Sequence, residues 1–128
     1  MRAMRARLAA AALLLALPAC AGLEQDYQKP TSVRLNGGEI SSLLTGRTIG
    51  LTNARGRSYT NTFGPDGRIL ISGGKSNLYG NWKVAGDRYC LTLDEDPREQ
   101  CMDIYRIANG SYQMVNADGS LRNTFKLQ

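Results

Sequence analysis

From residue 47 to the end of the chain, apolar and polar residues alternate in short runs that turn residues separate. Alternation with a period of two predicts strands with one buried face, and the regular spacing of the turns is typical of all-β proteins. We therefore predict an all-β fold in which a single small antiparallel meander of about eight strands forms a barrel or sandwich. The predicted strands cover residues 47–53, 57–63, 68–72, 78–84, 88–94, 100–107, 111–116 and 120–127.

The turns between these runs contain residues that favour tight turns. In Gly64-Pro65-Asp66-Gly67 the proline restricts φ and the final glycine accepts a positive φ. Three further dipeptides are typical hairpin loops: Gly86-Asp87, Asn109-Gly110 and Asp118-Gly119. Because each turn joins neighbours in sequence, the strands are expected to pair in sequence order, and eight of them suffice to close the sheet and remove its edges.

A short helix and a tether are predicted before the strands. Residues 39–44 fit one helical turn and a half, with Gly46 as a suitable stop. The apolar residues on its predicted buried face are Ile40, Leu43 and Leu44. The preceding residues 20–38 are mostly polar and include Pro30, so we interpret them as a flexible tether and residues 39–128 as one β domain.

The segment around Trp82 predicts a hairpin register and a core. If Gly86-Asp87 is a two-residue loop, Trp82 lies opposite Leu91 and the apolar residues of both strands share one face. A three-residue loop would instead set Trp82 opposite Cys90 and split that face. We prefer the first register, whose core face consists of Trp82, Val84, Tyr89, Leu91 and Leu93.

Cys90 and Cys101 lie on consecutive predicted strands joined by the acidic loop of residues 94–99. A hairpin centred between Glu95 and Asp96 sets the two cysteines directly opposite each other, near disulfide distance. We predict a disulfide, which stabilises the fold by about 2–4 kcal/mol. The alternative is a pair of metal ligands, for which the chain has no histidine to complete a site.

The start of the chain is typical of a secretion signal. Three of its first seven residues are basic: Arg2, Arg5 and Arg7. They precede an apolar run at residues 8–18, which is too short for a membrane-spanning helix of roughly 20 residues. Leu17-Pro18-Ala19-Cys20 then resembles the lipobox of bacterial lipoprotein precursors. We predict a lipoprotein signal peptide at residues 1–19 and lipidation of Cys20, the alternative being an ordinary secretory signal with a chance cysteine.

The lipoprotein resemblance implies a cellular location and a membrane as a partner. Acyl chains on Cys20 hold a protein to a membrane, since each buried methylene contributes about 0.8 kcal/mol. Ala21, rather than aspartate, after the cysteine implies sorting to the outer membrane. We therefore expect the β domain to lie on the periplasmic face of that membrane.

Charge adds little to this interpretation. Three of the 16 basic residues and none of the 11 acidic residues precede Cys20, so the chain from Cys20 onward has a net charge of +2. Its basic residues are scattered, with Arg55 and Arg57 as the nearest thing to a cluster and no interleaved aromatic residues for stacked bases. We expect no nucleic-acid partner.

Residues suited to catalysis are scarce. The chain has no histidine, the commonest general base, and cysteines joined in a disulfide cannot act as nucleophiles. No nucleophile elbow or phosphate-binding loop follows Cys20, so we expect a non-enzymatic protein without cofactor or metal. A Ca²⁺-binding loop is the alternative for the carboxylates, although their spacing does not match an EF-hand. They are Asp94, Glu95, Asp96, Glu99 and Asp103.

Aromatic residues are spread over the predicted strands. One interpretation is packing inside the barrel or sandwich, with each hydroxyl hydrogen-bonded to a partner. The other is that some of them line a binding cavity or an exposed contact surface. The candidate binding surface consists of Tyr59, Tyr79, Trp82, Tyr105 and Tyr112.

Two resemblances cover parts of the β domain. The turn at residues 63–67, the Gly80-Asn81-Trp82 strand, Cys90 and Cys101 occur in the order found in small secreted domains of unknown function common in alphaproteobacteria. Residues 82–91 are also similar to a hairpin of periplasmic β-barrel metalloprotease inhibitors, whose lipoprotein relatives lie in outer membranes. That family usually pairs this cysteine with one upstream of the tryptophan, whereas here Cys101 lies downstream.

These features together predict a non-enzymatic envelope lipoprotein whose β domain is a binding or envelope-maintenance module for an envelope partner. The first alternative is a protease inhibitor that inserts residues 21–38 into an enzyme cleft. The second is a lipocalin-like carrier of small apolar ligands, which needs a closed barrel with an unfilled interior.

Overall fold

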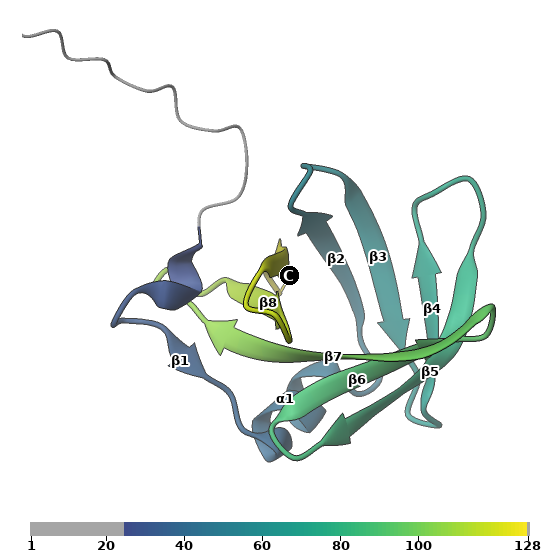
Figure 1. Ribbon diagram of the computed structural model, residues 1–128, viewed down its shortest axis with the longest axis horizontal. Coiled ribbons are helices and arrows are strands. Elements are labelled where there is room, and N and C mark those ends of the chain that lie inside the picture. Colours follow the sequence, from purple (N-terminus) through teal and green to yellow (C-terminus); the bar gives the residue numbers. More distant parts are fainter. Residues whose placement is uncertain (1–24, 128) are drawn as a thin grey trace, which may run out of the picture.

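The computed structural model describes residues 25–127 as a closed antiparallel β-barrel with one extra strand and one short α-helix (Figure 1). The all-β prediction is confirmed, and the barrel is the form that the sheet takes. Each of the eight barrel strands pairs with its sequence neighbour, and β9 pairs with β2 to close the sheet. These strands are β2 (Thr48–Asn53), β3 (Ser58–Phe63), β4 (Arg68–Ser72), β5 (Leu78–Ala85), β6 (Arg88–Leu93), β7 (Asp96–Arg106), β8 (Tyr112–Asn116) and β9 (Leu121–Phe125).

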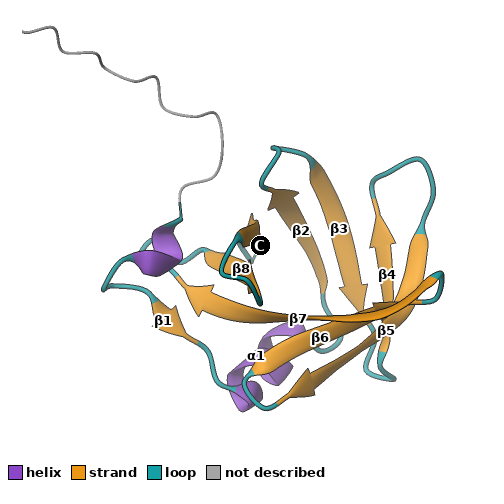
Figure 2. Cartoon of the chain, in the orientation of Figure 1, coloured by secondary structure: helices purple, strands orange, loops and turns teal. Residues whose placement is uncertain are grey.

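Three further elements precede the barrel strands (Figure 2). They are the 3₁₀ helix η1 (Asp26–Gln28), the strand β1 (Val33–Arg34) and the helix α1 (Gly37–Leu44). This differs from the flexible tether predicted for residues 20–38, because β1 pairs with β7 and the buried Leu35 donates its N–H to the carbonyl of Ile104 at 2.8 Å. A single buried leucine and a two-residue strand are too short to give a periodic signal in the sequence. Cys20 and the predicted signal at residues 1–19 lie outside the described residues.

Helix α1 packs against β5 and β6 at one end of the barrel (Figure 1). It begins with a capping box, in which the Asn36 side chain accepts from the Glu39 N–H and the Glu39 carboxylate accepts from the Asn36 N–H. Such a cap stabilises a helix by about 1 kcal/mol. The N–H of Gly37 donates to the Asp87 carboxylate at 2.8 Å and ties α1 to the β5–β6 turn. Its buried face is the predicted one: Ile40, Leu43 and Leu44.

The β5–β6 hairpin has the predicted register, with Trp82 opposite Leu91, and the three-residue loop is excluded. Trp82 and Tyr89 both pack edge-on against Phe63, with ring centroids 5.3 and 5.5 Å away. The indole N–H of Trp82 donates to the carbonyl of Gly64 at 2.9 Å, so the one polar atom of this side chain is satisfied. This aromatic cluster belongs to the hydrophobic core.

Cys90 of β6 and Cys101 of β7 lie directly opposite each other and form a disulfide, as predicted. Since both sulfurs are oxidised in this bond, neither is a thiolate available to a metal ion. The structure therefore supports the disulfide over the metal-ligand alternative.

The β6–β7 turn differs from the prediction. Its two turn residues are Asp94 and Glu95, so its centre lies one residue before the expected position between Glu95 and Asp96. A bulge between Leu91 and Leu93 restores the register, which is why the two cysteines still face each other. Because the acidic composition suggested a loop, β7 was expected to begin at residue 100, whereas its backbone pairing begins at Asp96.

Candidate binding groove at the β2 edge

The pairing of β2 with β9 closes the barrel, and we call it the seam. It leaves part of β2 without a neighbouring strand on one side. This strand pairs with β3 along residues 48–52, but with β9 only along residues 51–53. Because β9 ends at Phe125, β3 is the only described strand that pairs with residues 48–50. A free strand edge offers backbone N–H and C=O groups with which another extended segment can pair.

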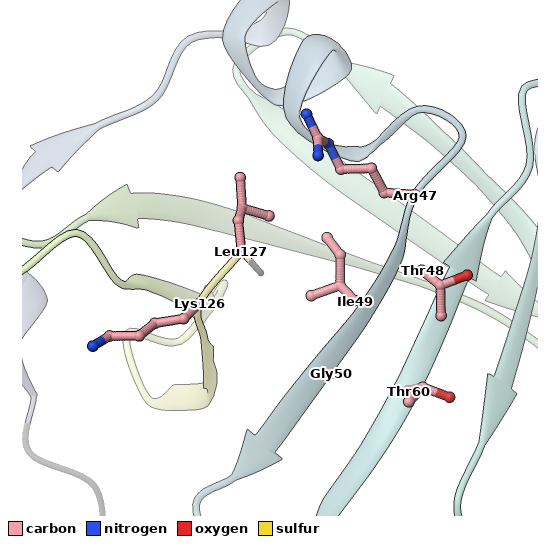
Figure 3. A pocket seen from close by; sticks show the side chains of 7 residues that line it. All are labelled: Arg47, Thr48, Ile49, Gly50, Thr60, Lys126 and Leu127. Carbon is pink, nitrogen blue, oxygen red and sulfur yellow. The ribbon is translucent and has the colours of Figure 1, made fainter.

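A groove of about 470 Å³ follows this edge. One wall is β2 and the other is the chain that follows β9 (Figure 3). Ile49 points toward the side of Leu127, whereas Thr48 and Thr60 point away from it (Figure 3). The groove therefore extends from the free edge of β2 onto the outer face of the sheet, where Gly50 is paired with Thr60. The lining residues are Arg47, Thr48, Ile49, Gly50, Thr60, Lys126 and Leu127.

Two cations flank the groove on opposite walls: Arg47 just before β2, and Lys126 just after β9. Within residues 25–127, neither forms an ion pair. Five basic side chains of the described residues are paired with carboxylates on or beside the barrel, namely Arg34, Arg68, Lys83, Arg88 and Arg98, whereas Arg55, Arg57, Lys75, Arg106 and Arg122 resemble Arg47 and Lys126 in forming no ion pair there. The groove therefore carries positive charge that is free to meet an anionic partner.

The outer face next to the groove consists of small side chains. Gly50 has no side chain to project from this surface, and a Cβ atom at this position would meet nothing within 4 Å. A second depression of about 470 Å³ continues across β2 and β3, and shares Gly50 and Thr60 with the first. Its hydroxyl-bearing residues are Thr52, Ser58, Tyr59, Thr60 and Ser72. Apart from Tyr59, which packs against the core, these side chains are small, so they can form hydrogen bonds without blocking an extended backbone.

The five residues of the predicted binding surface do not come together. Trp82 is only 9% exposed and belongs to the core. Tyr59 and Tyr112 also pack against the core, where the Tyr59 hydroxyl accepts from Asn123 Nδ2 at 2.9 Å and Tyr112 stacks on Phe125 with centroids 5.1 Å apart. For these three residues, the packing interpretation of the aromatic pattern is the correct one.

The other two residues lie on different strands. Tyr79 of β5 is 51% exposed, and its distance of three positions from Trp82 places it on the opposite face of the strand. Tyr105 of β7 is half-buried beneath Tyr27, with ring centroids 5.4 Å apart. The sequence cannot show this contact, because it depends on how residues 25–36 lie against the barrel.

Asp94 and Asp96 of the acidic turn are engaged in ion pairs. Arg68 binds Asp94 through two hydrogen bonds of 3.0 and 2.7 Å, and Arg98 binds Asp96 at 2.7 Å. The hydrogen bonds from the Arg98 side chain lower the pKa of the Asp96 carboxyl to about 2, and those from Arg68 lower the pKa of Asp94. These groups face their arginines rather than a common point, so the turn is not organised as a Ca²⁺ loop.

One further cluster has metal-ligand spacing. Cys90, Glu99 and Cys101 have ligand atoms within 4.8 Å of one another. The two sulfurs form the disulfide, and Glu99 pairs with Lys83 at 3.2 Å. The cluster is therefore a disulfide with an adjacent ion pair.

The described part of the N-terminal segment is held on the barrel. Arg34 of β1 pairs with Asp103 at 2.9 Å, and the Tyr27 N–H donates to Gln113 Oε1 at 3.0 Å. An inhibitor that inserts this segment into an enzyme cleft would have to break these contacts. The barrel interior likewise differs from an unfilled carrier cavity, because aromatic and aliphatic side chains pack its core.

Residues of the groove were not among those singled out from the sequence. The one local signal is Gly50, since a glycine inside a strand weakens it and often marks a place where another backbone approaches closely. Arg47 and Lys126 are 79 positions apart, and only the closure of the barrel brings them to the same groove.

No family model, curated protein or solved structure matches this chain. The two resemblances noted in the sequence therefore stay predictions. None of the described helices is long and apolar enough to cross a membrane.

Proposed function

We propose that this chain is a non-enzymatic lipoprotein of the cell envelope, anchored through Cys20 on the periplasmic face of the outer membrane. We further propose that its barrel binds an extended acidic segment of another envelope protein along the free edge of β2. The lipobox-like sequence supports the anchor. The disulfide supports an oxidising compartment, because disulfides persist in the envelope and are rare in the reducing cytosol.

The observation that carries the binding proposal is the free edge of β2 between two unpaired cations. An added strand would form backbone hydrogen bonds with Thr48 and Gly50, whose N–H and C=O groups point away from β3, each bond contributing about 0.5–1.5 kcal/mol. Leu127, which is 38% exposed, supplies apolar contact in the same groove. Because exposed ion pairs contribute only about 0–1 kcal/mol each, Arg47 and Lys126 would select the partner more than they would strengthen its binding.

A pair of synthetic peptides tests this proposal: a hexapeptide that alternates valine with glutamate, and its counterpart that alternates valine with lysine. Both can form an added strand, but only the first is anionic. Titration of the purified mature protein, followed by the backbone amide signals in NMR spectra, should show shifts at residues 48–50 with the glutamate peptide. The lysine peptide should produce weaker shifts at the same positions.

Charge reversal supplies the matched variants. Arg47→Glu combined with Lys126→Glu should abolish binding of the glutamate peptide and improve binding of the lysine peptide. Arg55→Glu with Lys75→Glu makes the same charge change on exposed loops outside the groove and should leave both affinities near the wild-type values. If both double variants lost affinity for the glutamate peptide equally, the effect would come from the net charge of the protein. Binding in the groove would then be refuted.

The anchor is tested separately by intact mass spectrometry of the protein purified from its own membranes. A lipidated chain that begins at Cys20 and gains two protons on reduction is the expected species. An unlipidated chain beginning elsewhere would refute the lipoprotein assignment, while the peptide experiment would still decide the groove.

A further inference from the structure

The first described residues lie on one side of the barrel. They form η1 and β1, which both lie beside β7 on that side (Figure 1). The Tyr27 ring packs on Tyr105 of β7 with centroids 5.4 Å apart, so η1 is held there. Cys20 precedes the first described residue, Gln25, by five positions, and five extended residues span at most roughly 18 Å. If Cys20 is lipidated, as proposed above, the membrane surface is therefore close to this side of the barrel.

Two arginines on this side share one carboxylate. Arg34 of β1 donates through Nη2 to Asp103 Oδ1 at 2.9 Å, and Arg88 of β6 donates through Nε to the same oxygen at 3.2 Å. These are the only hydrogen bonds of either guanidinium within residues 25–127. The single carboxylate balances one of the two positive charges, and each guanidinium has several further N–H donors. Because the two side chains are 45% and 44% exposed, those donors are accessible to an anion.

The neighbouring surface adds a further charge and an apolar contact. Arg106 of β7 lies opposite Val33 in the β1–β7 pairing, is exposed, and forms no ion pair within the described residues. Val33 is 46% exposed, one of three large apolar side chains that are exposed in the described part of the chain. Two other carboxylates of these elements, Asp26 and Glu99, are already paired with lysines. Free cations beside an exposed apolar side chain fit the boundary between anionic headgroups and acyl chains.

We propose that this surface, formed by Val33, Arg34, Arg88 and Arg106, docks on the membrane, and that Arg34 and Arg88 together bind the phosphate group of an anionic phospholipid. The inference rests on the proposed anchor at Cys20 and names what the anchored barrel contacts. Guanidinium groups match the geometry of phosphate oxygens. Each cation near an anionic bilayer strengthens binding by roughly fivefold, which is weak for a protein in solution. The short link to Cys20 keeps the surface at a high local concentration, so that this contact suffices to orient the barrel.

The test attaches the mature protein to bilayer nanodiscs and does not depend on lipidation in the cell. With the disulfide between Cys90 and Cys101 intact, Cys20 is the remaining cysteine and can be coupled to a maleimide-bearing lipid. A gadolinium chelate on the headgroups of a few other lipids broadens methyl NMR signals close to the bilayer. In discs that contain phosphatidylglycerol, the Val33 signals should be lost, while those of Leu70 on β4, across the barrel from β1, should remain (Figure 1). In discs of phosphatidylcholine alone, this difference should disappear.

Two double variants identify the arginines. Arg34→Gln with Arg88→Gln should restore the Val33 signals on the anionic discs to the intensity of the Leu70 signals. Arg55→Gln with Lys75→Gln removes the same charge from exposed loops between other strands, and this matched control should leave the loss of the Val33 signals unchanged.

Three results would overturn the proposal. Loss of the Val33 signals on neutral discs, or in the Arg34→Gln and Arg88→Gln variant, would mean that the short link alone brings Val33 near the bilayer. Loss of the Leu70 signals together with those of Val33 would mean that the barrel has no preferred face. Return of the Val33 signals when inorganic phosphate replaces chloride at the same ionic strength would mean that the arginines bind soluble phosphate rather than lipid.

These measurements are separate from the tests of the proposed function. Because the maleimide-bearing lipid replaces the natural acyl chains, a barrel without a preferred face would refute the docking surface and leave the anchor to mass spectrometry. An unlipidated protein in the cell would refute the anchor, while the nanodiscs would still report whether the surface binds anionic lipid.

Discussion

The β5–β6 hairpin and the β2–β9 seam belong to the same barrel but are built very differently. The hairpin joins sequence neighbours through six residue pairs, contains Trp82 and Tyr89 in its core face, and is linked by a disulfide to β7. The seam joins strands from opposite ends of the domain through three residue pairs, and leaves residues 48–50 of β2 with a free edge. The first region is organised for stability, and the second leaves backbone groups available.

This difference indicates where binding is compatible with folding. Residues already required by the core tolerate little change, because any loss of packing costs a large fraction of a small domain's stability. On β2, Ile49 and Leu51 belong to the core, whereas the exposed Thr48 and Gly50 do not and can change with less effect on stability. Locally weaker regions are therefore the natural places for recognition.

The largest effect is expected from Trp82→Ala. Removing this side chain from the aromatic cluster should lower the free energy of unfolding by about 3–5 kcal/mol, because it leaves a cavity beside Phe63 and Tyr89. The measurement is urea unfolding of the mature protein. Tyr79→Ala, on the exposed face of the same strand, should cost less than about 1 kcal/mol. Similar losses in both variants would contradict the assignment of one face to the core.

Removing the disulfide should have the next largest effect. Replacing Cys90 and Cys101 together by alanine should lower the free energy of unfolding by about 2–4 kcal/mol, since the bond limits the entropy of the unfolded chain. Reducing agent should destabilise the wild type by a similar amount and leave the double variant unchanged. If full reduction left the free energy of unfolding of the wild type unchanged, the disulfide would not contribute to stability.

Two glycines allow a direct comparison of the two regions. A Cβ atom on Gly80 would lie 2.3 Å from the carbonyl oxygen of Thr92, whereas one on Gly50 would meet nothing within 4 Å. Gly80→Ala should therefore destabilise the protein by about 1–3 kcal/mol through backbone displacement. Gly50→Ala should change stability by less than about 0.5 kcal/mol. Chemical denaturation of the two variants under the same conditions is the test, and the opposite order would refute the close packing of β5 on β6.

The smallest effect concerns the charges of the β6–β7 turn. The pKa of Asp96 lies below its unfolded value, at about 2 against 3.8, so its ion pair with Arg98 favours folding above pH 3.8 and is lost as the pH falls through 2. Both groups are at the surface, and the effect on stability should be small. Carbon-detected NMR titration should give an Asp96 midpoint near 2 that rises toward 3.8 in Arg98→Gln. Arg57→Gln, elsewhere on the barrel, should leave that midpoint in place.

Much of the fold follows from local sequence. The alternation of residues and the turn glycines predict the meander, and the Gly86-Asp87 loop predicts Trp82 opposite Leu91. The predicted disulfide is correct, although the turn centre is displaced and a bulge compensates. The predicted binding surface fails because period-two alternation assigns a residue to a face but not to the interior or exterior of a closed barrel. Tyr59 and Tyr112 therefore pack on the core, while Tyr79 does not.

The sequence by itself determined the all-β class, the order of the strands, the hairpin register and the disulfide, because each depends on residues close together along the chain. Only the tertiary structure decided that β9 stops short of the first half of β2, and that residues 25–36 lie against the barrel. These features depend on contacts between distant segments. Their geometry is set by the closure of the whole barrel, which no local pattern specifies.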